Sequence, residues 1–180
     1  MKNNVSFNST LTKFGMGLFE TIKVTDYPLD LDLHMNRLFN SIKELNLSIE
    51  NDKEFYKETI LKYIKENNVK NKALRLTVFD EGYNISLRDI TYNEDTYKKG
   101  FSLCISPIKR GDSIIYRHKT TNYFESMYSK HYATDRNFDD AIFLDSLSNI
   151  LECSMSNIFF IKSNTIYTPK SSSPILNGIM

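Results

Sequence analysis

The chain has 180 residues, 41% of them apolar and including 12 Phe and 11 Tyr, which is enough material for a buried core. Lys and Arg number 23 against 22 for Asp and Glu, so the net charge of +1 provides no basic field for nucleic acid or an anionic membrane. Because no apolar run approaches the roughly 20 residues that cross a bilayer, and the first residues lack a signal-peptide core, we expect a cytoplasmic protein.

The beginning of the chain predicts a strand pair followed by a helix. Residues 18–24 alternate between apolar and polar, as a half-buried strand does, and residues 29–33 form a second short alternating run, so we expect a hairpin. The period then changes, and residues 34–47 predict an amphipathic helix. Its apolar face comprises Met35, Leu38, Phe39, Ile42 and Leu45.

A second helix and three strands are expected next. The helix covers residues 53–66 and directs Tyr56, Ile60 and Ile64 inward. Strands are predicted over 73–79, 83–88 and 101–105, and the turn-forming residues 80–82 make the first two a hairpin. The first part of the chain is therefore expected to be a sheet with helices packed on it.

A domain junction is predicted over residues 106–112, where a proline, a glycine and three charges fall close together. We expect a sheet-and-helix domain over 1–106 and a cofactor-binding domain over 112–180. In the second domain, Thr121 or Asn122 is expected to cap a helix that runs to about Asp135. The apolar stripe of this helix comprises Tyr123, Met127, Tyr128 and Tyr132.

The remaining elements are short strands, predicted over 140–144, 157–161 and 165–167. Residues 171–174 are a loop rich in serine and end in proline. The whole chain therefore predicts an α+β protein whose second part is largely β.

Lys119 and Glu152 lie in two motifs, 33 positions apart. Lys119 belongs to the polar and aromatic stretch 117–123 and precedes Asn122 by three positions, whereas Glu152 begins the stretch 152–159. Composition alone would make both side chains solvated surface groups. A lysine amine becomes a nucleophile, however, where burial or a neighbouring cation favours its neutral form.

These motifs, together with residues 167–169 and the final Gly-Ile turn, resemble the pyridoxal-phosphate site of the fold type IV, or class IV aminotransferase, family. The resemblance implies that Lys119 is catalytic and holds the cofactor as a Schiff base, and that Glu152 faces the pyridine nitrogen. It also implies a D-amino-acid aminotransferase-like fold, in which an N-terminal α/β sandwich precedes a β-rich pseudo-barrel, here incomplete. The further cofactor contacts that it implies are Ser156, Asn157, Gly178, Ile179 and Met180.

Arg37 ends a His-x-x-Arg motif at residues 34–37, and the resemblance implies that its guanidinium grips the phosphate. A planar guanidinium suits this task because it donates two parallel hydrogen bonds to phosphate oxygens. Helical spacing alone, by contrast, places Arg37 on a solvated face with Asn40, Ser41 and Glu44.

Residues 15–21, Gly-x-Gly-x-Phe-Glu-Thr, resemble the first strand of the family, with Glu20 and Thr21 on the substrate side. A glycine turn before a strand explains the same pattern equally well. Arg75 and Arg117 are candidate clamps for a substrate carboxylate. Tyr123 is expected either to line the cofactor or to pack in the core.

Within the family, the spacing around Lys119 and residues 139–145 is most similar to aminodeoxychorismate lyases. Such enzymes release pyruvate from aminodeoxychorismate and leave 4-aminobenzoate for folate synthesis. An aminotransferase acting on a D- or branched-chain amino acid would use the same lysine and glutamate, so it remains an alternative. Family members form homodimers and continue past the Gly-Ile turn, where this sequence stops, so a truncated, non-catalytic member is the second alternative.

Other site chemistries are not expected. His34, His118 and His131 lack the spacing of metal ligands, and the sequence contains neither a Walker loop nor a dinucleotide fingerprint. Cys104 and Cys153 are isolated and are expected to be reduced thiols with small apolar roles.

Overall fold

The protein is described by a computed structural model that covers residues 1–179, and these form two compact units. The first unit comprises residues 1–92, 119–122 and 179; the second comprises residues 93–118 and 123–178. The predicted α+β class is confirmed, and the predicted domain ranges 1–106 and 112–180 remain a prediction. Within residues 1–179, no helix combines the length and apolar character needed to cross a membrane.

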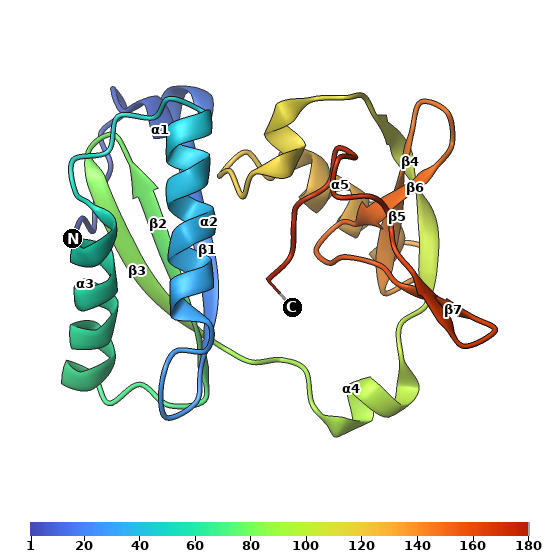
Figure 1. The fold of residues 1–180 in the computed structure, drawn as a ribbon, viewed down its shortest axis with the longest axis horizontal. Helices are drawn as coiled ribbons and strands as arrows, with labels where there is room; N and C mark the ends of the chain where they lie inside the picture. Colours follow the sequence, from blue (N-terminus) through green and yellow to red (C-terminus); the bar gives the residue numbers. More distant parts are fainter. Residues whose placement is uncertain (180) are drawn as a thin grey trace. The chain divides into compact units, whose positions relative to one another are not determined.

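The first unit is built on an antiparallel sheet in the order β1-β2-β3. Strands β1 (Gly17–Val24), β2 (Lys72–Phe79) and β3 (Gly82–Asp89) match three of the predicted strands, and β2 and β3 form the predicted hairpin. Helices α2 (Leu31–Glu44) and α3 (Lys53–Glu66) cover one face of this sheet (Figure 1). The short helix α1 (Thr10–Phe14) precedes β1 and was not predicted, because five residues are too few to show a period.

The core of the first unit lies between this sheet and its two helices. The predicted inward residues of α3 are all buried, and so are Met35 and Leu38 of α2, while the rest of the predicted α2 face packs partly buried against them. From β1, Leu18, Ile22 and Val24 enter the same core. Each fully buried side chain of this size contributes about 1.5–3 kcal/mol through removal of apolar surface from water.

The predicted hairpin of residues 18–24 with residues 29–33 is wrong. Helix α2 already begins at Leu31, and only an isolated bridge joins Val24 to Pro28. One edge of β1 is paired along its whole length with β2. The other edge forms a bridge between Leu18 and Thr120, which are 102 positions apart in the chain. Local alternation identified the strand but not the partner, because strand pairing is set by tertiary contacts.

The second unit contains a small mixed sheet in the order β4-β5-β6. Strand β4 (Leu103–Arg110) is parallel to β5 (Asp140–Asp145), and β5 is antiparallel to β6 (Ile150–Cys153). The prediction that the strand ends at residue 105 is wrong, because β4 continues through Pro107. A register shift between Ile105 and Lys109 accommodates the proline, whose missing N–H is tolerated at such irregularities.

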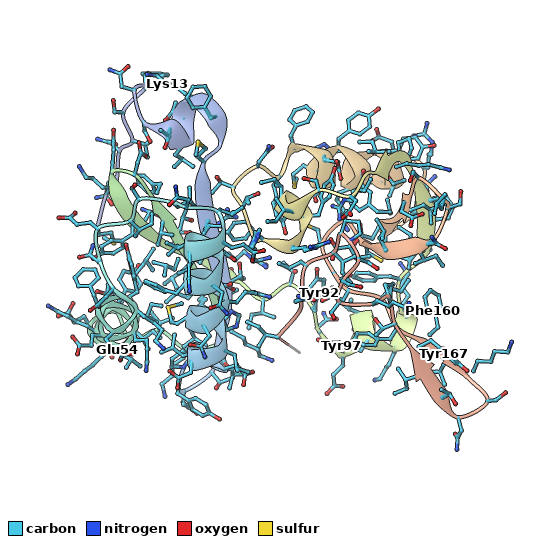
Figure 2. All side chains as sticks on the ribbon, turned by 45° about the horizontal axis from the view of Figure 1, so that its top comes forward. Lys13, Glu54, Tyr92, Tyr97, Phe160 and Tyr167 are labelled. Carbon is cyan, nitrogen blue, oxygen red and sulfur yellow. The ribbon has the colours of Figure 1, made fainter. Side chains whose placement is uncertain are left out.

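A separate two-stranded hairpin projects from the second unit (Figure 1). It consists of β7 (Phe160–Lys162) and β8 (Thr165–Tyr167), so the strand predicted over 157–161 begins later than expected. Phe160 pairs with Tyr167, and both side chains are visible on this hairpin in Figure 2. Within residues 1–179 the sheets do not close into a barrel, as expected for an incomplete pseudo-barrel.

Helix α5 (Phe124–Thr134) packs on β4 and β5 through small residues. Its buried residues are Ser126, Ser129 and Ala133, so the predicted aromatic stripe is wrong: Tyr128 is 50% exposed. The hydroxyls of Ser129 and Ser106 lie 2.9 Å apart, and only small side chains allow this close an approach of helix and strand. Helix α4 (Glu94–Lys99) and the 3-10 turn η1 (Ile114–Arg117) complete the unit and were not predicted.

Candidate functional site

Main-chain hydrogen bonds hold Lys119 at the edge of β1. The Phe19 N–H donates to the Lys119 carbonyl at 2.9 Å, and the Thr121 N–H donates to the Gly17 carbonyl at 2.8 Å. Between these bonds, Leu18 and Thr120 form an antiparallel bridge. Lys119 is therefore fixed on an extended segment and not on a helix, and Thr121 does not cap α5 as predicted, because α5 follows Tyr123 without a side-chain cap.

The Lys119 ammonium lies against an aromatic ring. Its Nζ is 4.6 Å from the centroid of the Phe19 ring, and Phe19 itself is 4% exposed. A cation over a ring is attracted by the π-electron density, while the apolar surface removes part of its water. Lys119 is thus a half-buried amine held in a defined position beside the Phe19 ring.

The Gly-x-Gly motif has a packing role at this edge. The Thr121 hydroxyl donates to the carbonyls of Gly15, at 2.5 Å, and Gly17, at 3.2 Å. A Cβ at Gly17 would lie 2.9 Å from the Leu11 Cδ1 and 3.1 Å from the Thr121 side chain. The second glycine of the motif is therefore needed because the side chains of Leu11 and Thr121 pack against it.

Gly17→Ala is expected to lower the free energy of unfolding by about 1–3 kcal/mol, since overpacking forces neighbouring atoms to move. The added methyl must displace Thr121 or Leu11. Chemical denaturation of both proteins measures the loss. Gly111→Ala is the matched control, because a Cβ at Gly111 meets no atom within 4 Å. Equal stability of the two variants would contradict this role for Gly17.

Arg75 and Thr21 lie on the same side of the sheet as Phe19. Thr21 pairs with Arg75 across β1 and β2, and residues two apart in a strand face the same way. The Arg75 guanidinium lies 3.6 Å from the centroid of the Phe19 ring, so two cations, Arg75 and Lys119, share one aromatic ring. The structure thus brings three predicted site residues together, and their roles remain a prediction.

Arg37 is bound to a buried carboxylate. Its Nε donates to Glu20 Oε1 at 2.8 Å and its Nη2 to Glu20 Oε2 at 2.5 Å, and the His34 Nδ1 lies 2.7 Å from Oε2. Glu20 is 1% exposed. Burial alone would raise the pKa of Glu20, but the hydrogen bonds from Arg37 and His34 outweigh burial and hold that pKa below its ordinary value. Glu20, which the sequence suggested as a substrate-side group, therefore fixes the orientation of the predicted phosphate ligand.

Glu152 in the second unit is 8% exposed and has donors on both oxygens. The Arg110 Nη1 donates to Oε1 at 2.6 Å. The other oxygen, Oε2, accepts the Leu176 N–H at 3.1 Å and the Asn157 amide at 3.3 Å. Asn157 also donates to the Leu176 carbonyl, so it ties the Glu152 carboxylate to the chain before the Gly-Ile turn. These donors fix the orientation of the Glu152 carboxylate.

Three further predicted site residues lie in the second unit, namely Arg117, Tyr123 and Ser156, and they differ in burial and hydrogen bonding. The Arg117 Nη2 donates to Asp112 at 3.2 Å and to the Ser172 carbonyl at 3.0 Å. Among the described residues, no acceptor reaches the buried Nε of Arg117. Tyr123 is half-buried just before α5, and Ser156 is exposed with its carbonyl accepting the Cys153 N–H.

The phosphate turn predicted from the sequence is only partly described. Gly178 is exposed and Ile179 is half-buried, with no regular secondary structure at either residue. Met180, the third predicted contact of this turn, lies outside the described residues. The role of the turn stays a prediction.

Sequence reasoning missed Arg110, which binds Glu152, and Glu125, which binds Arg110. Arg110 lies 42 positions before Glu152 and also binds Glu125 of α5, with 2.6 Å between the Arg110 Nε and Glu125 Oε1. Arg110 stands in a charged stretch that we interpreted as a domain junction. Only its 5% exposure distinguishes it from a surface arginine, and burial is not visible in the sequence pattern.

The two thiols are expected to differ in reactivity. Burial raises the pKa of Cys153 to about 11, so almost none of it is thiolate at pH 8, whereas Cys104 is half-buried. In the folded protein, iodoacetamide should therefore modify Cys104 at least about tenfold faster than Cys153. Mass spectrometry of time points measures both rates, and guanidinium-unfolded protein is the control in which the rates should converge. Faster labelling of Cys153 in the folded state would disprove its burial.

Similar sequences include enzymes of two activities. The family model described as amino-transferase class IV matches residues 17–180. The aminodeoxychorismate lyase of Bacillus subtilis is 27% identical over 187 residues, covering 92% of this chain and 62% of that protein. The branched-chain-amino-acid aminotransferase of Pseudomonas aeruginosa is 28% identical over 189 residues, covering 92% of this chain and 61% of that protein. The chain thus spans less than two thirds of the length of either relative.

The fold is shared with solved structures. A Legionella pneumophila protein provisionally assigned as a 4-amino-4-deoxychorismate lyase superposes with a TM-score of 0.89 at 23% identity, covering 99% of this chain and 70% of that one. At this level of identity the likeness establishes the fold alone. It confirms the fold class implied by the resemblance.

Proposed function

The chain belongs to the class IV aminotransferase family, and from this membership we propose that it is a lyase that uses pyridoxal phosphate to convert 4-amino-4-deoxychorismate to 4-aminobenzoate and pyruvate. Enzymes of the family use this cofactor. The observation that carries the proposal is the placement of Lys119. Its main chain is fixed along β1 and its amine lies on the Phe19 ring. The similarity to the lyase of Bacillus subtilis supports this choice of reaction.

The side chains present fit the chemistry of the cofactor. An aldehyde requires an amine, which Lys119 supplies, and a pyridinium nitrogen requires an anion, which the buried Glu152 supplies. A phosphate requires hydrogen-bond donors and positive charge, which Arg37 supplies on α2. Arg37 is oriented by Glu20, so its guanidinium does not need to be ordered when phosphate binds.

The proposed reaction divides its tasks among the residues of the chain. When bound, pyridoxal phosphate would supply an electron sink for the carbon that carries the substrate amine. Lys119 takes the proton from that carbon and returns a proton to the departing enolpyruvate, as a general base and then a general acid. Glu152 would supply the negative charge that a protonated ring nitrogen requires. The product is aromatic, which makes the elimination favourable.

Two arginines match a substrate with two carboxylates. The Arg75 guanidinium lies beside the ring that Lys119 contacts, and Arg117 has a buried Nε that no described residue satisfies. We propose that they bind the substrate carboxylates, with Thr21 and Tyr123 as neighbouring contacts. Guanidinium groups suit this role because they bind carboxylates with two parallel hydrogen bonds.

Branched-chain aminotransferase activity is the second candidate. It is favoured by the similarity to the Pseudomonas aeruginosa enzyme, and it would use Lys119 and Glu152 in the same way up to the loss of the first proton. A transaminase would then keep the amine and need a keto acid as acceptor. We propose a homodimer for either activity.

The test has two stages. Pyridoxal phosphate should give a visible absorption band, and borohydride should fix the cofactor on Lys119, as peptide mass spectrometry would show. Formation of 4-aminobenzoate and pyruvate without a keto acid supports the lyase, and amine transfer that requires a keto acid supports the aminotransferase. A protein that is unlabelled at Lys119 after this treatment is not an enzyme of the proposed type.

A further inference from the structure

A buried arginine joins two carboxylates in the second unit. Arg110 is 5% exposed, its Nε lies 2.6 Å from Glu125 Oε1, and its Nη1 lies 2.6 Å from Glu152 Oε1. Its guanidinium also lies 3.7 Å from the ring centroid of Phe143 and 4.6 Å from that of Tyr116. Two ion pairs and two aromatic contacts therefore fix the guanidinium in one orientation.

The charges of this cluster do not cancel. The formal charges of these three side chains sum to −1, because Arg110 carries one positive charge and Glu125 and Glu152 carry one negative charge each. Without Glu125, Arg110 and Glu152 would form a neutral pair. A neutral pair would attract a cation that approaches Glu152 much more weakly than a carboxylate with one charge in excess.

The two carboxylates have different surroundings. Glu152 is almost buried and bound through both oxygens, whereas the side chain of Glu125 is 27% exposed on α5. The Tyr116 hydroxyl donates to Glu125 Oε2 at 3.0 Å, so that oxygen is engaged as well. Glu125 thus lies on the outer side of Arg110, and Glu152 lies on the inner side.

We propose that Glu125 is a positioning residue for the cofactor: by neutralising Arg110, it leaves the charge of Glu152 available to hold a protonated pyridine nitrogen. This inference rests on the proposed function, because it assigns the ring nitrogen to Glu152. It adds a residue that touches neither cofactor nor substrate and acts only through Arg110.

The experiment uses pyridoxal phosphate labelled with ¹⁵N in the ring, whose nitrogen chemical shift reports directly whether the ring is protonated. We expect a protonated ring in the wild-type protein and a shift toward the unprotonated form in Glu125→Gln. The cofactor Kd should rise roughly tenfold, as when a partner of a metal ligand is removed. Borohydride labelling of Lys119 at saturating cofactor should persist.

Two further variants separate charge from packing. Tyr116→Phe removes the hydrogen bond to Glu125 but keeps the ring and the Glu125 charge, so the ring nitrogen should stay protonated. The double variant Arg110→Met, Glu125→Gln removes one charge of each sign and should restore the protonated ring. If Glu125→Gln alone does not fold, the ring protonation measured in the double variant tests the proposal in its place.

A wild-type ¹⁵N shift and Kd in Glu125→Gln, with Lys119 still labelled, would overturn this inference and leave the proposed function standing. An unprotonated ring in the double variant would overturn it as well. A wild-type protein without a labelled Lys119 would reject the proposed function and this inference together.

Discussion

Replacing Lys119 with alanine should abolish covalent retention of pyridoxal phosphate and lower kcat by roughly 10²–10⁴-fold, the usual contribution of a positioned proton-transfer group. In the proposed reaction, this variant would lose both the amine that binds the cofactor and the base that removes the substrate proton. Borohydride trapping followed by peptide mapping measures the first loss, and release of 4-aminobenzoate measures the second.

Lys98→Ala is the control for this experiment, because the side chain of Lys98 is 74% exposed on α4 and its ion pair with Glu94 is long, at 3.8 Å. It should keep the wild-type rate and labelling pattern. If Lys119→Ala retained activity and trapped the cofactor on another lysine, Lys119 would not be the catalytic residue.

Replacing Glu20 with glutamine is expected to lower the free energy of unfolding at pH 7 by about 3 kcal/mol, since breaking a buried ion pair leaves a charge without its partner. Glu20 is 1% exposed and receives two hydrogen bonds from Arg37, whose side chain is 16% exposed. Denaturation by urea at pH 7 measures the loss.

The loss should depend on pH in a defined direction. Because the pKa of folded Glu20 lies below its ordinary value of 4.5, its contribution to stability is complete above that value and disappears as the pH falls through the folded pKa. The difference between wild type and Glu20→Gln should therefore narrow below about pH 4.5. A difference that stayed constant down to pH 3 would show that packing, and not charge, explains it.

Glu54→Gln provides the matched control for Glu20. The side chain of Glu54 is 62% exposed, and its ion pair with Lys57 spans 3.3 Å. Exposed pairs of this kind contribute about 0–1 kcal/mol because water and salt screen them. The control variant should therefore unfold within about 1 kcal/mol of the wild-type protein at every pH tested.

Apolar periodicity correctly predicted those helices and strands of the first unit that bury one face in its large core. Helix α3 has the predicted bounds and buries the three predicted residues. Apolar residues that recur every 3.6 positions lie on one face of a helix, and that face packs on the sheet. The same reasoning failed for α5. Helix α5 contacts its sheet through two serines and an alanine. The aromatic residues therefore do not form the buried face that their spacing predicted.

Short motifs, and not patterns of charge, suggested the candidate site residues. Lys119, Glu152 and Arg37 were identified from short motifs, although single lysines and glutamates are usually surface groups. Arg110 and Glu125 escaped notice because each is an ordinary charged residue in its own segment. Their pairing appears only when β4, α5 and β6 are packed together.

By itself, the sequence determined the class of fold, most helices and strands, and the family, since each depends on local periods or short motifs. It also suggested the candidate site residues, whose roles stay a prediction. Only the tertiary structure decided that Lys119 lies along β1, that Glu20 holds Arg37 and that Arg110 binds both Glu125 and Glu152. These contacts join residues 15–100 positions apart. No period along the chain encodes them, because partners that distant are selected by shape and charge once the elements have packed.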